Sequence, residues 1–122
     1  METPRSTPDV SVLLPVRDAV DTLEPALRSV LAQACARFEV IVVDDGSSDG
    51  SSDILREAAR RDSRVRVLSM APRGLVPALE TARAAARAPL LARMDADDVM
   101  RPGRLAAQRA ALDQNPDWAV CG

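Results

Sequence analysis

A chain of 122 residues with a formal net charge of −2 is long enough for one domain with a sizeable core, and its slightly acidic balance argues against nucleic-acid binding. All 16 basic residues are arginine, and histidine is absent. These absences exclude a histidine metal site, a serine–histidine nucleophile, a P-loop lysine and a Schiff-base lysine. A general base within this chain can therefore only be an aspartate or a glutamate.

The two cysteines, Cys35 and Cys121, lie far apart in the sequence. They are expected to be buried, reduced thiols, with neither a disulfide nor a metal framework. No apolar run approaches the roughly 20 residues of a transmembrane helix, so no transmembrane segment is predicted. We expect a cytoplasmic location, which includes the inner face of the membrane for the full-length protein.

The first predicted strand is the apolar segment Val10–Val16. Residues 1–9, which are polar and contain prolines, are expected to form a flexible tail before it. Pro15 fits near the end of the strand, where a missing N–H costs little. Asp21 and Glu24 have the spacing of a capping box, which predicts a helix with Asp21 as its N-cap.

The second predicted strand, Phe38–Val43, is β-branched and almost continuously apolar, so it should be central and covered on both faces. Asp44 and Asp45 follow it, and a loop rich in glycine and serine then leads into a second helix. The third strand, Val65–Leu68, is short and alternating, as edge strands often are.

A third helix is predicted to open at Arg73 and Gly74, with Leu75 and Ala78 among its inward-facing residues. In the fourth helix, Pro102 fits the first helical position. Asn115 and Pro116 close this helix, and Trp118–Cys121 is predicted to begin a fifth strand.

Between these two helices, the fourth predicted strand is the mostly apolar run from Leu90 to Met94, which stops at three carboxylates, Asp95, Asp97 and Asp98. Like charges this close repel one another unless a cation joins them, and carboxylate oxygens suit Mg²⁺ or Mn²⁺. The alternative is a solvated acidic turn that caps the next helix.

Strand and helix alternate four times along the chain, which predicts an α/β fold of three layers, α/β/α, around a mainly parallel sheet. The loops that follow the strands of such a sheet lie at one edge, where open α/β sheets bind ligands. We expect the charged side chains that follow the four strands to converge there, namely Asp18, Asp44, Asp45, Arg73, Asp95, Asp97 and Asp98.

A nucleoside diphosphate fits such an edge. A carboxylate after the second strand can accept hydrogen bonds from a base or a ribose, and a divalent ion after the fourth strand can bridge the phosphates. Other nucleotide sites lack their residues, because the first strand is followed neither by G-x-G-x-x-G nor by a glycine-rich loop with lysine.

Over residues 10 to 122, the chain resembles the N-terminal, nucleotide-binding half of an inverting family 2 glycosyltransferase with the GT-A fold, which is the fold of nucleotide-diphospho-sugar transferases. The matching stretches, in the family's order and spacing, are Val10–Val16, Ile41–Gly50, Arg73–Leu75, Ala92–Asp98 and Pro102–Leu105. The motifs V-D-D-G-S-x-D-G and D-A-D-D are moderately specific alone and strong together.

The resemblance implies a nucleoside-diphosphate sugar as donor, Mg²⁺ or Mn²⁺ as cofactor and an acceptor that it does not define. Pro15, Val16 and Asp18 would line the nucleotide site, and Asp44 or Asp45 would bind base and ribose. Asp95 and Asp97 would form the D-x-D motif, with Asp97 the more direct metal ligand and Asp95 also close to the nucleotide. Asp98 is either a further ligand or a helix-capping residue, and Arg73 would lie near the phosphates or be a solvated arginine.

The sequence departs from the family at Arg17, where relatives often have an aromatic residue, so aromatic stacking is not carried over to this position. Glu80 and Ala82 replace common Asn and Gly residues. We expect the chain to be truncated after the fourth helix, without the acceptor-binding half that carries the catalytic base. Its fourth strand would then have an unpaired edge, which predicts a homo-oligomer through that edge or disorder of Trp118–Gly122. The alternative function is a non-catalytic α/β fragment whose acidic edge is structural.

Overall fold

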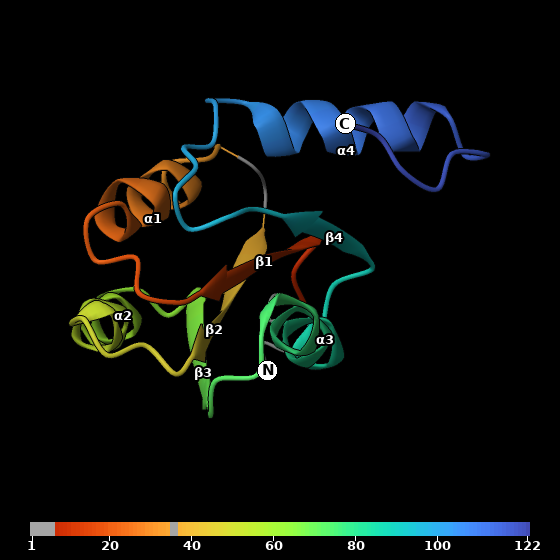
Figure 1. The fold of residues 1–122 in the computed structure, drawn as a ribbon. Helices are drawn as coiled ribbons and strands as arrows, with labels where there is room; N and C mark the ends of the chain where they lie inside the picture. The colour runs from red at the N-terminus through yellow and green to blue at the C-terminus, as the bar shows by residue number, and fades with distance from the viewer. Residues whose placement is uncertain (1–6, 35–36) are drawn as a thin grey trace.

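Four parallel strands form one sheet in the order β3-β2-β1-β4, with helices on both faces (Figure 1). The structure is a computed structural model that describes residues 7–34 and 37–122. Along the chain the elements are β1 (Val10–Val16), α1 (Leu23–Leu31), β2 (Phe38–Asp45), α2 (Ser51–Arg61), β3 (Val65–Met70), α3 (Leu75–Ala85), β4 (Leu90–Arg93) and α4 (Arg104–Gln114). The predicted three-layer α/β class is confirmed.

The direction of the crossovers explains which face each helix covers. The chain moves from β1 to β2 to β3 in one direction, with α1 and α2 on one face of the sheet, and then returns past β2 and β1 to β4 with α3 on the other face (Figure 1). Right-handed crossovers require this change of face when the direction reverses. The reversal lies between β1 and β4, and ligands bind at such a switch point.

Strand alternation divides the core into two clusters. Val12, Leu14 and Val16 point toward α1 and α2, whereas Leu13 of β1 and Val43 of β2 point toward α3. Every residue of β1 and β2 is buried, as expected for central strands covered on both faces. β3 lies at one edge of the sheet, as its short alternating sequence predicted.

Pro15 is accommodated inside β1 because β4 ends early. The Met94 N–H donates to the Leu13 carbonyl at 3.1 Å, and Leu13 pairs with Arg93, the last residue of β4. Backbone groups two residues apart face the same way, so the nitrogen of Pro15 faces this side too, beyond the end of β4.

Two helix starts differ from the prediction. α1 begins at Leu23 with Thr22 as its N-cap, so the predicted N-cap at Asp21 is wrong. The Thr22 and Leu23 N–H groups instead donate to the Ala19 carbonyl, in a turn that already supplies their partner. α4 begins at Arg104 with Gly103 as its N-cap, so Pro102 lies before the helix and not in its first position.

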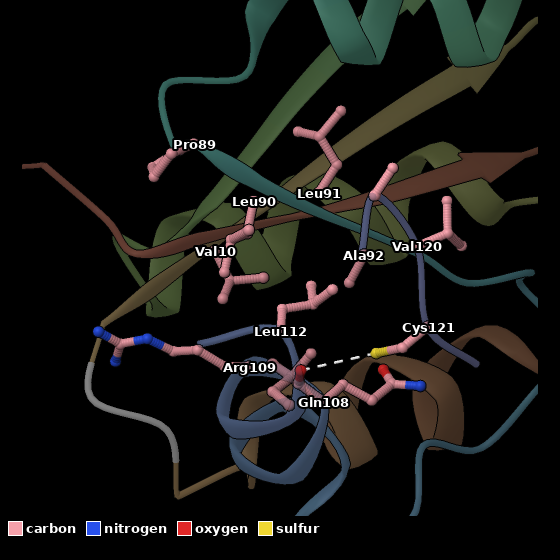
Figure 2. A pocket seen from close by; sticks show the side chains of 12 residues that line it. Val10, Pro89, Leu90, Leu91, Ala92, Gln108, Arg109, Leu112, Val120 and Cys121 are labelled. Carbon is pink, nitrogen blue, oxygen red and sulfur yellow. Dashed lines mark hydrogen bonds between the residues drawn. The ribbon is translucent and has the colours of Figure 1, made fainter. Parts of the chain in front are cut away.

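The predicted fifth strand is also wrong, because residues 118–122 have no regular structure. The Trp118 N–H donates to the Asn115 carbonyl, and the Cys121 thiol donates to the Gln108 carbonyl at 3.6 Å, so the segment turns back along α4. Figure 2 shows the resulting cavity of about 400 Å³, lined by β4, α4 and this segment. The segment lies beside β4 without pairing to it, and Val120 is 81% exposed.

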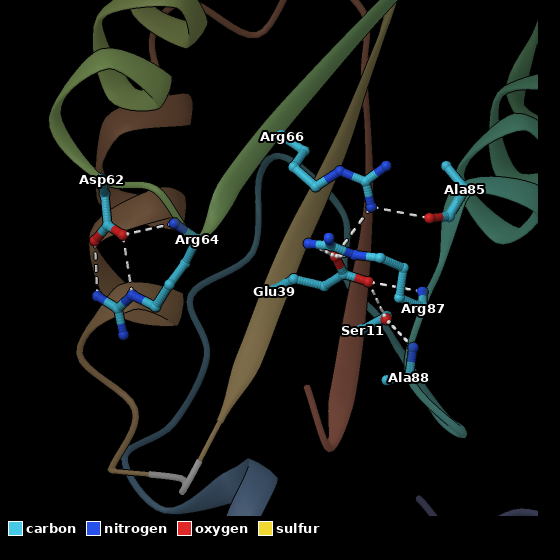
Figure 3. A network of polar contacts seen from close by, with 8 residues as sticks. All are labelled: Ser11, Glu39, Asp62, Arg64, Arg66, Ala85, Arg87 and Ala88. Atoms are coloured by element: carbon cyan, nitrogen blue, oxygen red, sulfur yellow. Dashed lines mark hydrogen bonds and ion pairs between the residues drawn. The ribbon is translucent and has the colours of Figure 1, made fainter. Parts of the chain in front are cut away.

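At the amino end of the sheet, the buried Glu39 of β2 joins three elements (Figure 3). Its carboxylate accepts hydrogen bonds from the Ser11 hydroxyl at 2.6 Å, from the Arg87 N–H at 2.8 Å and from the Arg66 guanidinium at 3.0 Å. The Ser11 hydroxyl in turn accepts from the Ala88 N–H. The connection from α3 to β4 is thereby held against β1 and β2.

The structure describes only part of the predicted N-terminal tail and one of the two cysteines. Pro8 is buried and the Asp9 N–H donates to the Arg37 carbonyl, so the last residues of the predicted tail contact the domain, whereas residues 1–6 lie outside the described part. Cys121 is a half-buried free thiol, and Cys35 lies outside the described residues. Among the described helices, none has the length and hydrophobicity to cross a membrane.

Candidate functional site

The register of the parallel strands places the predicted site residues at one edge of the sheet. Asp44 of β2 pairs with Val16, the last residue of β1, and Arg93 of β4 pairs with Leu13. Asp95 and the carboxylates after it therefore leave β4 toward the same edge that Asp44 occupies. The predicted convergence on the carboxyl edge is confirmed at the level of the strands.

A cavity of about 250 Å³ opens between the end of β1 and the start of α3. By strand alternation, Pro15 lies on the α3 face of β1 and Asp45 on the same face of β2, and Arg17 is the first residue after β1. The lining residues are Pro15, Val16, Arg17, Asp45, Gly74, Leu75 and Ala78. The cavity thus has aliphatic residues, one buried aspartate and one exposed arginine in its lining.

Asp45 is the buried carboxylate of this cavity and also holds the start of α3. The Asp45 side chain is almost fully buried, and its two oxygens accept hydrogen bonds from the Arg73 N–H at 2.8 Å and the Gly74 N–H at 2.9 Å. α3 has no side-chain cap of its own. A carboxylate from the neighbouring strand therefore satisfies backbone donors next to its first turn.

Asp44 and Asp18 organise the loop between β2 and α2. The Asp44 carboxylate accepts from the Ser47 N–H at 3.0 Å and from the Ser52 hydroxyl. Asp18 has a positive φ of 48°, and its carboxylate accepts from the Ser48 N–H at 2.7 Å. Asp44 and Asp45 lie inside β2, two residues beyond the predicted end of the strand, because they continue the parallel pairing with Ser69 and Met70 of β3.

The side chains of Asp95, Asp97 and Asp98 are all exposed, and one carboxylate oxygen from each lies within 4.8 Å of the others. Mg²⁺ binds oxygen ligands at about 2.1 Å, so two of its ligands lie about 3 to 4 Å apart, and small side-chain rotations bring these oxygens within that range. The donor set consists only of carboxylates, which suits Mg²⁺ or Mn²⁺.

The residues near this cluster bear on two alternatives left by the sequence, one for Asp98 and one for Arg73. The Arg93 guanidinium lies 3.4 Å from Asp95 and supplies a neighbouring positive charge. Asp98 does not cap α4, because the N-cap is Gly103 and the Asp98 N–H instead closes a turn to the Asp95 carbonyl. Arg73 lies just before α3 with its side chain exposed at the carboxyl edge of the sheet, consistent with either of its predicted roles.

Four of the lining residues were not predicted as site residues, namely Arg17, Gly74, Leu75 and Ala78. Leu75 was expected to face the core, but its side chain is 51% exposed and lines the cavity instead. Arg17 was noted only as a departure from the family, although its place directly after the first strand could have marked it. The helical spacing of Leu75 gave no such signal, because Leu75 shares its helix face with Ala78 and Ala82, which are buried.

Solved structures with the same arrangement are GT-A glycosyltransferases. TarS from S. aureus in complex with UDP-GlcNAc matches with a TM-score of 0.81 and 25% identity, over 88% of this chain and 32% of that protein. The mannosyltransferase PcManGT from Pyrobaculum calidifontis, in complex with GDP-Man and Mn²⁺, matches with a TM-score of 0.80 and 28% identity, over 89% of this chain and 33% of that protein.

Sequence relatives agree with this fold class. The chain is 33% identical over 116 residues to the uncharacterized glycosyltransferase EpsJ of Bacillus subtilis. This alignment covers 94% of the chain and 34% of the relative. It is 39% identical over 98 residues to the succinoglycan biosynthesis protein ExoU of Rhizobium meliloti, covering 80% of the chain and 28% of the relative. The family model of glycosyl transferase family 2 matches residues 11–122, and the chain belongs to that family. It spans about a third of the length of these relatives.

Proposed function

We propose that residues 10–122 form the donor-binding domain of a glycosyltransferase that transfers a sugar from a nucleoside-diphosphate sugar to an acceptor. The main support is the meeting of an aliphatic cavity and a carboxylate cluster at one edge of a parallel sheet. The matched proteins that hold UDP-GlcNAc or GDP-Man support a nucleotide-sugar donor for this chain as well.

In this proposal the base lies in the cavity beside Pro15, Val16 and Asp45, and the phosphates extend toward the carboxylate cluster. Asp44 and Asp18 shape the adjoining loop and contact the ribose side of the nucleotide. Arg73 lies near the phosphates, where a guanidinium offers paired donors to an anion.

Asp95 and Asp97 would hold Mg²⁺ or Mn²⁺, with Asp97 the more direct ligand. A divalent ion at this place supplies positive charge that stabilises the departing diphosphate. The Mn²⁺ in the matched mannosyltransferase supports this assignment. The name of the relative ExoU, which refers to succinoglycan biosynthesis, supports a carbohydrate acceptor. The catalytic base would come from outside residues 10–122, and the reaction would take place in the cytoplasm.

Isothermal titration with UDP, GDP and dTDP, with and without Mn²⁺, tests the proposal. We expect one of these nucleotides to bind in a Mn²⁺-dependent way, and Asp97→Ala to weaken that binding about tenfold or more, because a metal ligand is lost. Asp95→Ala should weaken it in the same direction.

The matched control is Asp117→Ala, which removes an exposed carboxylate beyond α4. It should leave the affinity for metal and nucleotide unchanged. If Asp95→Ala and Asp97→Ala also change neither affinity, the acidic edge is structural, and the non-catalytic α/β fragment becomes the better interpretation.

A further inference from the structure

We propose that Ser29 of α1 and Gln33, just after this helix, are positioning residues of the carboxylate cluster, because they hold the segment that follows it. The inference rests on the proposed function, in which Asp95 and Asp97 hold a divalent cation. In this role Ser29 and Gln33 act through the backbone that carries the carboxylates, without contact to the cation or the nucleotide.

The three carboxylates lie on a short loop, residues 95–99, whose two ends are fixed. Before the loop, the Met94 side chain is buried, and the Met94 N–H donates to the Leu13 carbonyl at 3.1 Å. After the loop, the Met100 side chain is buried too, and the Met100 N–H donates to the Ser29 hydroxyl at 2.8 Å. Both methionines pack in the core cluster that contains the buried residues of α1. The loop therefore leaves the core at Met94 and returns to it at Met100.

Gln33 holds the next part of the chain, which runs beside α1 (Figure 1). The Gln33 side chain is only 6% exposed, its Nε2 donates to the Arg101 carbonyl at 2.9 Å, and its Oε1 accepts from the Leu105 N–H at 3.2 Å. The Leu105 N–H belongs to the first turn of α4, whose N-cap, Gly103, has no side chain to accept it. Gln33 therefore serves as the cap of α4 and fixes the backbone between this helix and the carboxylate loop.

The charges on the carboxylates favour a more open loop. Asp95, Asp97 and Asp98 each place one oxygen within 4.8 Å of the others, so their ionised side chains repel one another until a cation joins them. The Asp98 N–H closes a turn to the Asp95 carbonyl at 3.1 Å, and Ser29 fixes the exit of that turn. A loop that is held closed before the cation arrives loses less conformational freedom on binding.

The polar contacts fix the position of the segment more narrowly than its apolar packing does. Methionine side chains adapt to irregular spaces, so the burial of Met94 and Met100 by itself permits several loop positions. A hydrogen bond restricts both the distance and the angle between its two groups. Ser29 and Gln33 together make three such contacts to backbone groups of residues 100–105, and these contacts select one position of the loop.

Calorimetric titration of UDP and GDP into the whole chain in the presence of Mn²⁺ tests the positioning role. Ser29→Ala and Gln33→Ala should each weaken the nucleotide that binds by about fivefold, because a contact that fixes the metal-binding loop is lost. Ser29→Thr keeps the hydroxyl and should restore the affinity of the unsubstituted chain. Thr81→Ala is the matched control, because it removes a helix hydroxyl that donates to the Pro77 carbonyl of α3, and it should have no effect.

A double variant separates positioning from a general loss of stability. In Asp97→Ala a metal ligand is already lost, so Ser29→Ala/Asp97→Ala should bind no more weakly than Asp97→Ala. Hydrogen exchange of the metal-free chain gives a second measurement, independent of ligand binding. The Met100 N–H should exchange faster in Ser29→Ala and the Leu105 N–H faster in Gln33→Ala, whereas the N–H groups of β1 and β2 should keep their protection.

The positioning role is overturned for either residue whose alanine variant keeps the nucleotide affinity or the exchange rate of the unsubstituted chain. It is also overturned if the losses in the double variant add, or if Thr81→Ala weakens binding equally, because the effect is then one of general stability. Failure of the unsubstituted chain to bind either nucleotide would instead overturn the proposed function, and the positioning role with it. Thermal unfolding of each variant checks that the fold is retained.

Discussion

Glu39 is a buried charged residue whose environment favours the ionised carboxylate. Burial raises the pKa of the Glu39 carboxyl, but the hydrogen bonds from the Ser11 hydroxyl, the Arg87 N–H and the Arg66 and Arg87 side chains outweigh burial, so the pKa lies below its ordinary value of 4.5. A lowered pKa in the folded state means that ionised Glu39 stabilises the fold above the unfolded pKa. This contribution is lost as the pH falls through the folded pKa.

Glu39→Gln should therefore lower the free energy of unfolding at pH 7 by about 1 to 3 kcal/mol, because a charged acceptor is lost while two partly exposed guanidinium groups remain. The difference between the two proteins should shrink as the pH falls from 5 toward 3. Urea denaturation across this range measures it. Glu80→Gln, which changes an exposed ion pair on α3, is the control and should cost little at any pH. A difference that does not depend on pH would show that packing, and not ionisation, sets the cost.

At the scale of elements, two loops at the carboxyl edge are packed against each other at Gly46. This residue, after β2, has a φ of +74°, and a Cβ built on it would lie 2.5 Å from Pro72 Cδ in the loop after β3. Both the backbone conformation and the close approach require glycine. The contact aligns the loop that follows Asp44 and Asp45 with the loop that carries Arg73.

Gly46→Ala should destabilise the fold by about 1 to 2 kcal/mol from the positive φ and by about 1 to 3 kcal/mol more from the clash with Pro72. Gly103→Ala is a matched control, because Gly103 has a φ of +82° with no atom within 4 Å of the built Cβ. Urea denaturation of both variants separates the two costs. Equal destabilisation by Gly46→Ala and Gly103→Ala would show that the clash with Pro72 is relieved without cost. The double variant Gly46→Ala/Pro72→Ala should recover part of the stability that Gly46→Ala loses beyond Gly103→Ala.

The strands were predicted well because the apolar pattern that marks each strand lies within a short stretch of sequence. The continuous apolar runs of β1 and β2 mark buried strands, and the observed β1 has the predicted bounds. The predicted start of α1 was wrong because the preceding turn is held by residues at the start of α2, where the Ala19 N–H donates to the Ser51 hydroxyl and the Val20 N–H to the Asp49 carboxylate. A hydrogen bond between segments that are far apart in the chain produces no periodic pattern in the sequence.

The sequence predicted that the site residues share one edge of the sheet, but it did not predict the cavity there. Parallel strands bring their carboxyl ends together whatever the loops contain, so the placement of Asp44 and Asp97 at one edge followed from the parallel direction of the strands. The cavity depends on how the start of α3 is placed beside the end of β1, which leaves Leu75 exposed and could not be deduced from helical spacing. The double role of Asp45 depends on the same placement of α3.

At the scale of the whole molecule, the outer edge of β4 has no strand partner among the described residues. β4 is short and presents alternating half-buried and exposed side chains. Leu91 is 49% exposed, and Figure 2 shows it on the opposite side of β4 from the α4 residue Leu112. Residues 118–122 lie near this edge without covering its backbone groups. Unpaired backbone donors and acceptors beside exposed apolar side chains favour pairing with a second chain.

We therefore predict that the 122-residue chain self-associates through β4, and that Leu91→Lys weakens this association by about tenfold or more, because a charge at a strand edge opposes pairing with a second copy. Size-exclusion chromatography with light scattering over a range of concentrations measures the mass. Ala110→Lys, which adds the same charge at an exposed position of α4, is the control and should associate like the unsubstituted chain. A monomer at every concentration would contradict pairing through this edge, and equal association of both variants would move the interface away from β4.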